Sequence, residues 1–126
     1  MQHNDTIRIL IGCASQARLE ACLALFRDTT RLVRAHRVAS LQELADSLRD
    51  RQWDLLIVDD DHPELSPSDA LVTFSAAGSD IPCLVRAADP SGPDALAWRR
   101  AGAREVLPSD AGELLPLAAM REVDAL

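Results

Sequence analysis

The chain alternates between short apolar runs and longer segments in which apolar residues recur every three or four positions. Short runs of branched apolar residues are typical of buried strands, and the longer spacing is typical of amphipathic helices. Strands are predicted at residues 7–12, 32–38, 54–58, 81–85 and 105–107, with the second less buried because arginines and a histidine interrupt it. Helices are predicted at residues 15 to about 29, 40–48, 66–78, 94–101 and within 110–126.

Several helix boundaries carry local signals. Ser40 is followed three positions later by Glu43, which is the spacing of a capping box. Ser66 and Pro67 resemble an N-cap followed by proline at the first helical position. The last helix contains Pro116, and proline in a helix interior removes a hydrogen bond and clashes with the preceding turn. We therefore expect this helix either to start at Pro116 or to kink there.

The fivefold alternation of strand and helix predicts an α/β fold. Right-handed crossovers between successive strands give one parallel sheet with helices on both faces. Residues 54–58 are apolar on both faces, which is typical of a central strand covered by helices. We expect a doubly wound, five-stranded parallel sandwich. Ligands of such sheets bind at the carboxyl ends of the strands, so the residues that follow each strand form the candidate site.

The composition fits one ordinary globular domain. The chain has 126 residues, of which 48% are hydrophobic and 26% charged, and we expect one domain over residues 1–126 with a flexible polar N-terminus at residues 1–6. Thirteen arginines stand against 20 acidic residues, for a net charge of −7. We therefore expect no direct contact with nucleic acid, which requires clustered cations. The chain has no lysine, which excludes any mechanism that needs a lysine ammonium.

Three widely spaced cysteines, Cys13, Cys22 and Cys83, form no C-x-x-C pair, and an odd number argues against a disulfide framework. We expect reduced, buried thiols, with Cys13 inert because nearby acidic residues disfavour its thiolate. No apolar run reaches the roughly 18 residues of a membrane span, and the first residues lack the apolar region of a signal peptide. We expect a cytoplasmic protein without membrane association.

The residues around the strand ends resemble the receiver domain of bacterial two-component response regulators. Residues 53–59 are similar to that family's third strand, which ends in the phosphoacceptor aspartate, here Asp59. Pro63 takes the place of the family's loop proline, residues 81–82 resemble the opening of its fourth strand, and residues 102–103 resemble the Gly-Ala before its fifth. The resemblance covers nearly the whole chain. It implies the flavodoxin-like or CheY-like arrangement, with strand order 2-1-3-4-5.

The chain departs from that family in the rest of the phosphorylation chemistry. The family has an acid pair that helps to hold magnesium, a hydroxyl residue, an aromatic switch residue and a lysine. At these positions the chain has Cys13, Ala14, Ala87, Val106 and Ser109. Magnesium prefers oxygen ligands, and each lost transition-state contact costs ~3 kcal/mol. The resemblance therefore implies a degenerate pocket with no magnesium, no other metal or cofactor and no catalysis, and Asp59 as a vestigial phosphoacceptor or a structural cap.

Arg86 has two possible roles in that pocket. It can reach in and pair with Asp59 in place of the missing cations, or it can be a surface arginine with its head group in water. We expect Asp60 and Asp61 to be solvated loop acids and His62 an exposed loop histidine. If Asp59 has no partner, Asp59→Ala should be neutral or stabilising; a clear loss of stability would point to a salt bridge with Arg86.

We interpret the chain as a pseudo-receiver, a non-catalytic signalling module that works through protein contacts and without phosphorylation. It would be the N-terminal regulatory or dimerisation domain of a bacterial regulator, with an output domain beyond residue 126, although a stand-alone protein fits equally. The family's contact face is its fourth helix, fifth strand and fifth helix, through which a homodimer or a protein partner would bind. The candidate interface residues there are Trp98, Arg99, Arg100, Arg104 and Val106.

Three alternatives stay open. Trp98 can instead lie half-buried against the sheet beside solvated arginines. The domain can be an atypical receiver that still accepts phosphate at Asp59. It can also be a small-molecule sensor that uses the vacated pocket.

Overall fold

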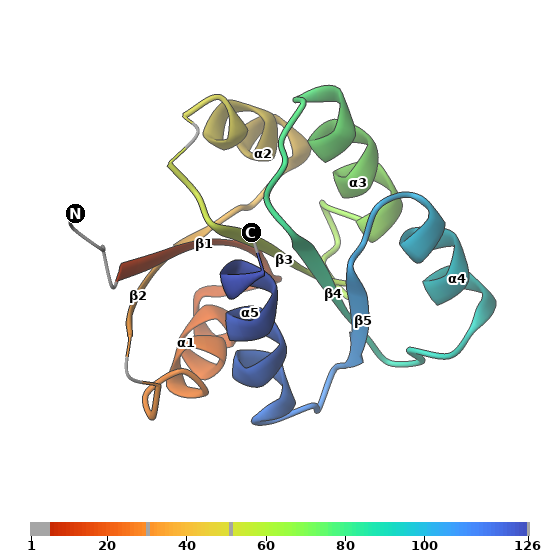
Figure 1. The fold of residues 1–126 in the computed structure, drawn as a ribbon. Helices are drawn as coiled ribbons and strands as arrows, with labels where there is room; N and C mark the ends of the chain where they lie inside the picture. The colour runs from red at the N-terminus through yellow and green to blue at the C-terminus, as the bar shows by residue number, and fades with distance from the viewer. Residues whose placement is uncertain (1–5, 30, 51, 126) are drawn as a thin grey trace.

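Strands and helices alternate along the whole of the chain that the structure describes. The computed structural model describes residues 6–29, 31–50 and 52–125. The strands are β1 (Thr6–Gly12), β2 (Leu32–Arg37), β3 (Leu55–Asp59), β4 (Cys83–Ala87) and β5 (Glu105–Pro108) (Figure 1). The helices are α1 (Gln16–Ala24), α2 (Leu41–Leu48), α3 (Pro67–Ala76), α4 (Pro93–Arg100) and α5 (Leu114–Asp124). None of these helices is long and apolar enough to cross a membrane, within the ranges just given.

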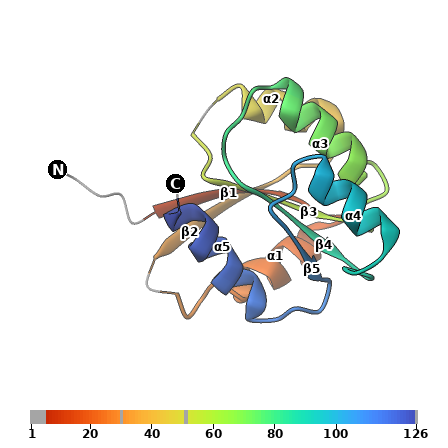
Figure 2. The ribbon, with the colours of Figure 1, turned by 45° about the vertical axis from the view of Figure 1, so that its right-hand side comes forward.

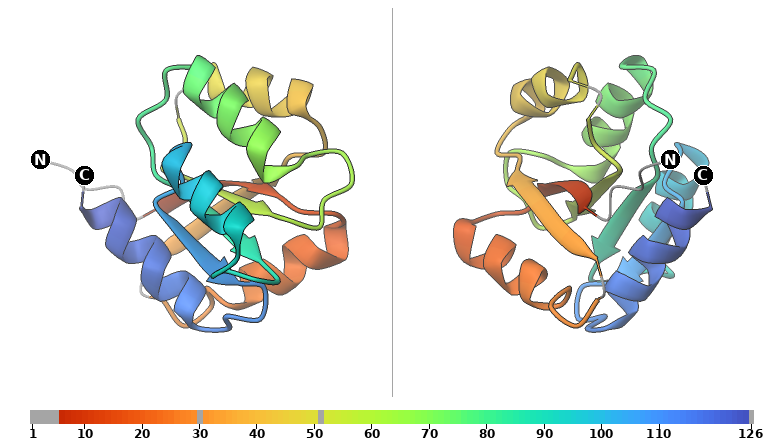
Figure 3. Two further views of the ribbon diagram at one scale, coloured as in Figure 1. Left: turned by 90° about the vertical axis from the view of Figure 1, so that its right-hand side faces the viewer. Right: turned by 60° about the vertical axis from the view of Figure 1, so that its left-hand side comes forward.

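The five strands form one parallel sheet in the order β2-β1-β3-β4-β5. Helices α2, α3 and α4 cover one face of this sheet, and α1 and α5 cover the other (Figures 2 and 3). Every residue of β3 and β4 is buried, whereas the edge strand β2 alternates between exposed and partly buried positions. The predicted doubly wound sandwich and its strand order are confirmed.

Each face of the sheet packs its own apolar layer. Along β3, Leu56 and Val58 belong to the layer under α2, α3 and α4, whereas Leu55 and Ile57 belong to the layer under α1 and α5. This alternation follows from the two-residue period of a strand, whose successive side chains point to opposite faces. A polar residue at a strand end therefore faces the same layer of helices as the residue two positions before it.

Strand β4 begins later than predicted, at Cys83 instead of residue 81. Pro82 has no N–H to donate, and only its carbonyl takes part in pairing, as the acceptor for the Leu56 N–H at 3.0 Å. Proline is confined to the start of a strand for this reason. The strand also ends later than predicted, at Ala87 instead of residue 85, so that Arg86 lies inside the strand with Asp59 as its register partner on β3.

Two helices also differ from their predicted bounds. Helix α1 ends at Ala24, and the turn that follows is tightened into i→i+3 bonds, such as Phe26 N–H to the Leu23 carbonyl at 3.0 Å. Hydrophobic periodicity continues through such a turn, because Phe26 is still buried. Helix α5 starts at Leu114, so Pro116 lies in the first turn, where its missing N–H has no partner to lose.

The predicted flexible N-terminus is wrong for Thr6. This residue opens β1 and is the register partner of Leu32 on β2. The remainder of that prediction, residues 1–5, lies outside the described residues.

Candidate functional site

An ion pair between Asp59 and Arg86 occupies the carboxyl end of the two central strands. Arg86 Nε donates to Asp59 Oδ1 at 2.6 Å, and Arg86 Nη2 donates to Asp59 Oδ2 at 2.8 Å. Asp59 is 1% exposed and Arg86 is 8% exposed. Both carboxylate oxygens are therefore held by one guanidinium in a bidentate arrangement, the strongest geometry available to this pair.

The sheet itself brings the two side chains together. Asp59 follows Leu55 and Ile57 at the two-residue period of β3, and Arg86 follows Leu84 in the same way on β4. Those three apolar residues all belong to the layer under α1 and α5. Asp59 and Arg86 therefore point to the same face, side by side on neighbouring strands. Of the two roles predicted for Arg86, the structure shows the one in which it reaches into the pocket.

A second arginine, Arg18 of α1, closes over the same carboxylate from outside the sheet. Its Nη2 lies 2.9 Å from Asp61 Oδ2 and 3.5 Å from Asp59 Oδ2. The side chain of Arg18 is 43% exposed, so this bridge is far more accessible to water than the one from Arg86. Asp61 is accordingly not a free solvated acid: it links the loop after β3 to α1.

The electrostatic effects of the pair extend to nearby thiols. Burial alone would lower the pKa of the Arg86 guanidinium, but the hydrogen bonds to Asp59 outweigh it and the pKa is raised. Burial, followed by the negative charge of Asp59, raises the pKa of the Cys13 thiol. Burial raises the pKa of Cys22 to about 11. Both thiols are free and protonated at neutral pH, a state in which a cysteine is a poor nucleophile.

The loop after β3 is held by hydrogen bonds. Asp60 Oδ2 accepts the Ala88 N–H at 3.1 Å. His62 is 6% exposed, its Nε2–H donates to the Val38 carbonyl at 3.1 Å, and its Nδ1 accepts the Glu64 N–H at 3.1 Å. The prediction of an exposed loop histidine is therefore wrong. The ring is buried because both of its nitrogens find backbone partners, which removes the penalty for taking a polar group out of water.

The other predicted pocket positions lie at the same edge of the sheet. Cys13 and Ala14 follow β1, and the Cys13 thiol donates weakly to the Ser15 carbonyl at 3.5 Å. Ala87 is buried at the end of β4, and its carbonyl accepts the N–H of the exposed Ser109 at 2.9 Å. None of these four side chains supplies a carboxylate or a cation. The charges of the pocket come from Asp59, its two arginines, the neighbouring loop acids and Arg37, whose Nη1 donates to the Cys13 carbonyl at 3.0 Å.

The candidate interface residues divide into buried and exposed sets. Trp98 is 9% exposed and Val106 is 5% exposed, and the indole Nε1–H of Trp98 donates to Ser68 Oγ on α3 at 3.2 Å. These two side chains pack inside the domain and do not form part of its surface, which corrects their place in the predicted interface. The exposed members are Arg99, Arg100 and Arg104.

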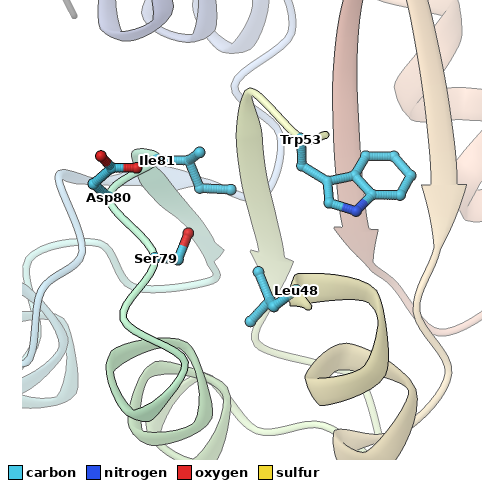
Figure 4. Close-up of a pocket in the computed structure, with 5 residues that line it drawn as sticks. All are labelled: Leu48, Trp53, Ser79, Asp80 and Ile81. Atoms are coloured by element: carbon cyan, nitrogen blue, oxygen red, sulfur yellow. The ribbon is translucent and has the colours of Figure 1, made fainter. Parts of the chain in front are cut away.

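A small pocket elsewhere in the fold is separate from this site. It lies at the amino ends of β3 and β4, has a volume of about 190 Å³ and is lined by Leu48, Trp53, Ser79, Asp80 and Ile81 (Figure 4). The indole of Trp53 donates to the Ser47 carbonyl at 2.9 Å. Because ligands of parallel sheets bind at the carboxyl ends of the strands, we assign no function to this pocket.

Comparisons with known proteins identify the fold. No protein-family profile matches the chain, and no curated protein is similar to it in sequence. Solved structures of receiver domains match it closely. The receiver domain of a sensor histidine kinase from Pseudomonas aeruginosa, with magnesium coordinated in its active-site cleft, gives a TM-score of 0.78 at 19% identity, over 94% of this chain and 98% of that one.

Two further structures agree. A two-component response regulator from Legionella pneumophila gives a TM-score of 0.80 at 16% identity, over 95% of this chain and 99% of that one. The non-phosphorylated HemR receiver domain of Leptospira biflexa gives 0.73 at 22% identity, over 95% of each chain. The chain has the receiver fold. At these identities the likeness establishes the fold and leaves the chemistry of the cleft to this chain's own residues.

The prediction about magnesium needs correction. We expected none, yet the Pseudomonas domain, which has the same fold, coordinates magnesium in its active-site cleft. Among the residues described for this chain, no group of three or more His, Cys, Asp or Glu is placed to hold a metal ion. A magnesium ion at Asp59 would compete with Arg86 and Arg18 for the carboxylate oxygens. Experiments on this cleft therefore have to include magnesium.

Sequence reasoning found Arg86 but missed Arg18. Arg18 lies three residues after the N-cap Ser15, whose Oγ accepts the Arg18 N–H at 3.2 Å. A residue in the first turn of α1 lies close to the carboxyl end of β1. This proximity was the one feature of the sequence that could have indicated Arg18 as a pocket residue. The rotation of the helix about its axis, which decides whether the side chain reaches Asp59, is set by packing of the whole apolar layer.

Proposed function

We propose that this chain is a pseudo-receiver: a receiver-fold module of bacterial two-component signalling that works without phosphorylation of Asp59 and has no catalysis of its own. It would be a single domain over residues 1–126, serving as the N-terminal regulatory or dimerisation part of a response regulator. The observation that carries the proposal is the buried, bidentate bond between Arg86 and Asp59.

The ion pair opposes phosphoryl transfer in two ways. A carboxylate must present a free oxygen to attack phosphorus, and here Oδ1 and Oδ2 both accept hydrogen bonds from Arg86. Release of Asp59 would leave a buried guanidinium without its counterion, which is strongly unfavourable. Phosphoryl transfer also depends on cations that stabilise the equatorial oxygens. The lysine that supplies one in the family is replaced by Ser109, and the chain contains no lysine.

The test is exposure of the domain to small phosphodonors with magnesium present. We expect incubation with acetyl phosphate to add no phosphoryl group to Asp59 in the intact-mass spectrum. We also expect beryllofluoride to leave the amide NMR spectrum unchanged. Asp59→Asn serves as the matched control. A magnesium-dependent phosphoryl adduct that Asp59→Asn abolishes would overturn the proposal and establish the alternative, an atypical receiver phosphorylated at Asp59.

The contact surface that we propose is the face formed by α4, β5 and α5, through which two copies would associate. Most charges there pair within the domain: Arg104 contacts Glu122 at 3.3 Å, and Arg121 pairs with Glu105. On α4, Leu96 is 50% exposed. Arg100 stands four residues later on the same side of the helix and has no ion pair among the described residues. An exposed aliphatic side chain beside an unpaired arginine is a suitable centre for such a contact.

Sedimentation of two single variants tests this surface. We expect the unmodified domain to dimerise at micromolar concentration and Leu96→Asp to weaken that dimer by at least tenfold, because a charge would be buried at its centre. The matched control is Val72→Asp on α3, where an equally aliphatic side chain is 68% exposed outside the proposed surface. A domain that remains monomeric, or a dimer that Val72→Asp weakens as much, would overturn the homodimer.

A further inference from the structure

A cleft opens beside the ion pair, between α1 and the loop that joins β5 to α5. Its volume is about 440 Å³, within the range of small-molecule sites. One wall is apolar and is made by Ala21 and Cys22 of α1 and by Leu25, the residue that follows the helix. The polar end is formed by Arg18, Arg86 and Ser109. The cleft therefore combines an apolar wall with hydrogen-bond donors gathered at one end.

Arg86 presents a free nitrogen to this cleft. Its Nε and Nη2 are used by Asp59, and no other bond of its guanidinium is found in the part of the chain that the structure describes. Within the same residues, no buried side-chain nitrogen or oxygen lacks a hydrogen-bond partner. Nη1 must therefore reach solvent, and the cleft is where Arg86 meets it. Asp59 thus fixes the position of the buried Arg86 side chain, while Nη1 of its guanidinium can still donate a hydrogen bond to a ligand in the cleft.

Two further donors stand at the same end. Arg18 contacts Asp61 and Asp59 through Nη2, and its side chain is 43% exposed. The exposed Ser109 hydroxyl has no hydrogen bond to the residues described here. A carboxylate has two acceptor oxygens and no donor, so it matches this set, and arginine is the side chain best suited to bind it.

The surrounding charge selects against highly charged anions. Asp59 and Asp61 already neutralise the two arginines, and Asp110 adds another carboxylate to the cleft lining. These five groups sum to a charge of −1, so a dianion such as phosphate would meet about twice the repulsion that a monoanion meets. A monoanion with an apolar body offsets its smaller repulsion by contact with the apolar wall. We propose that the cleft binds a small organic acid, with its single carboxylate on Arg86 Nη1, Arg18 and Ser109 and its apolar body against Ala21 and Leu25. This site goes beyond the proposed function and does not depend on the contact surface of the domain.

Thermal unfolding in the presence of straight-chain monocarboxylates tests the site. At constant ionic strength, we expect hexanoate to raise the Tm in a saturable way, acetate to raise it less, and inorganic phosphate to leave it unchanged, because a ligand that binds only the folded state stabilises it. Ser109→Asp, which adds a carboxylate at an exposed position of the cleft, should remove at least nine-tenths of the hexanoate shift. Arg49→Gln, which removes an exposed arginine outside both the cleft and the proposed contact surface, should retain the full shift.

Three results would overturn the proposal. The first is the absence of a saturable shift with any of the carboxylates. The second is a hexanoate shift that Ser109→Asp leaves unchanged, which would place binding elsewhere. The third is stabilisation by phosphate without stabilisation by hexanoate, which would contradict the assigned ligand class. Because Asp59 phosphorylation is measured separately by mass, none of these results resembles a failure of the proposed function.

Discussion

Arg86→Met is expected to lower the free energy of unfolding by about 3–5 kcal/mol, the usual cost of removing one partner of a buried ion pair. Methionine fills a similar volume and keeps the apolar part of the side chain packed. The cost arises at Asp59, whose side chain is 2% exposed and would be left charged and without its two hydrogen bonds. Urea unfolding at neutral pH, followed by circular dichroism, measures the change.

The double variant Arg86→Met with Asp59→Leu separates the lost charge from lost packing. Replacement of a complete buried pair by apolar side chains of similar volume is often neutral or stabilising, so we expect the double variant to be at least as stable as the unmodified domain. Arg18→Gln is the matched control on the same carboxylate, and it should cost less than about 1 kcal/mol because its side chain is 43% exposed. Equal losses for Arg18→Gln and Arg86→Met would contradict the distinction between a buried and an exposed bridge.

The sequence left the effect of Asp59→Ala conditional: neutral or stabilising if Asp59 has no partner, and a clear loss of stability if it pairs with Arg86. The structure selects the second case, because Asp59 accepts two hydrogen bonds from Arg86. Asp59→Ala should therefore be destabilising, because it leaves the guanidinium buried and unpaired. The pair can thus be required for stability even if the position has no chemical activity.

The fold was predictable because buried strands and amphipathic helices each leave a distinct pattern of apolar residues in the sequence. A strand buried on both faces is mostly apolar, as residues 55–58 of β3 are, and the apolar residues of an amphipathic helix recur every three or four positions. Element ends were less predictable. The start of β4 depends on hydrogen bonds that Pro82 cannot make, and the tightened turn after α1 preserves the burial of Phe26 without preserving the helix.

The candidate site was only partly predictable, for a related reason. The position of Asp59 follows from its place at the end of β3, and the possible pairing with Arg86 follows from neighbouring strands. Contacts made by side chains from a helix or a loop cannot be predicted from the order of the strands. Arg18 reaches Asp61 from a helix, and His62 reaches the Val38 carbonyl from a loop. Such contacts depend on helix rotation and loop path, which are fixed by packing of the complete domain.

The stability of the domain is expected to fall by about 4 kcal/mol between pH 8 and pH 10.5 through Cys22 and Cys83, and Cys13, whose pKa is also raised, adds to this fall. Burial raises the pKa of the Cys22 and Cys83 thiols to about 11 and about 12, from the ordinary value of 9.0. Above pH 9 the unfolded thiols lose their protons while the native thiols keep them. The native state then binds more protons, so the free energy of unfolding falls as pH rises, by roughly 1.4 kcal/mol per thiol and pH unit.

The composition makes this measurement unusually specific. The chain has no lysine and no tyrosine, and its 13 arginines remain charged throughout this range, so cysteine is the side-chain type that titrates there. Urea unfolding under reducing conditions at several pH values gives the slope. Cys22→Ala should remove about half of the predicted 4 kcal/mol fall, whatever its effect on stability at neutral pH, because the readout is the change with pH. A flat profile in the unmodified domain, or an unchanged slope in Cys22→Ala, would contradict the burial of these thiols. Cys22 also lines the cleft beside Arg86. The part of the pH dependence that Cys22→Ala removes therefore measures how well α1 excludes water from the apolar layer around the ion pair.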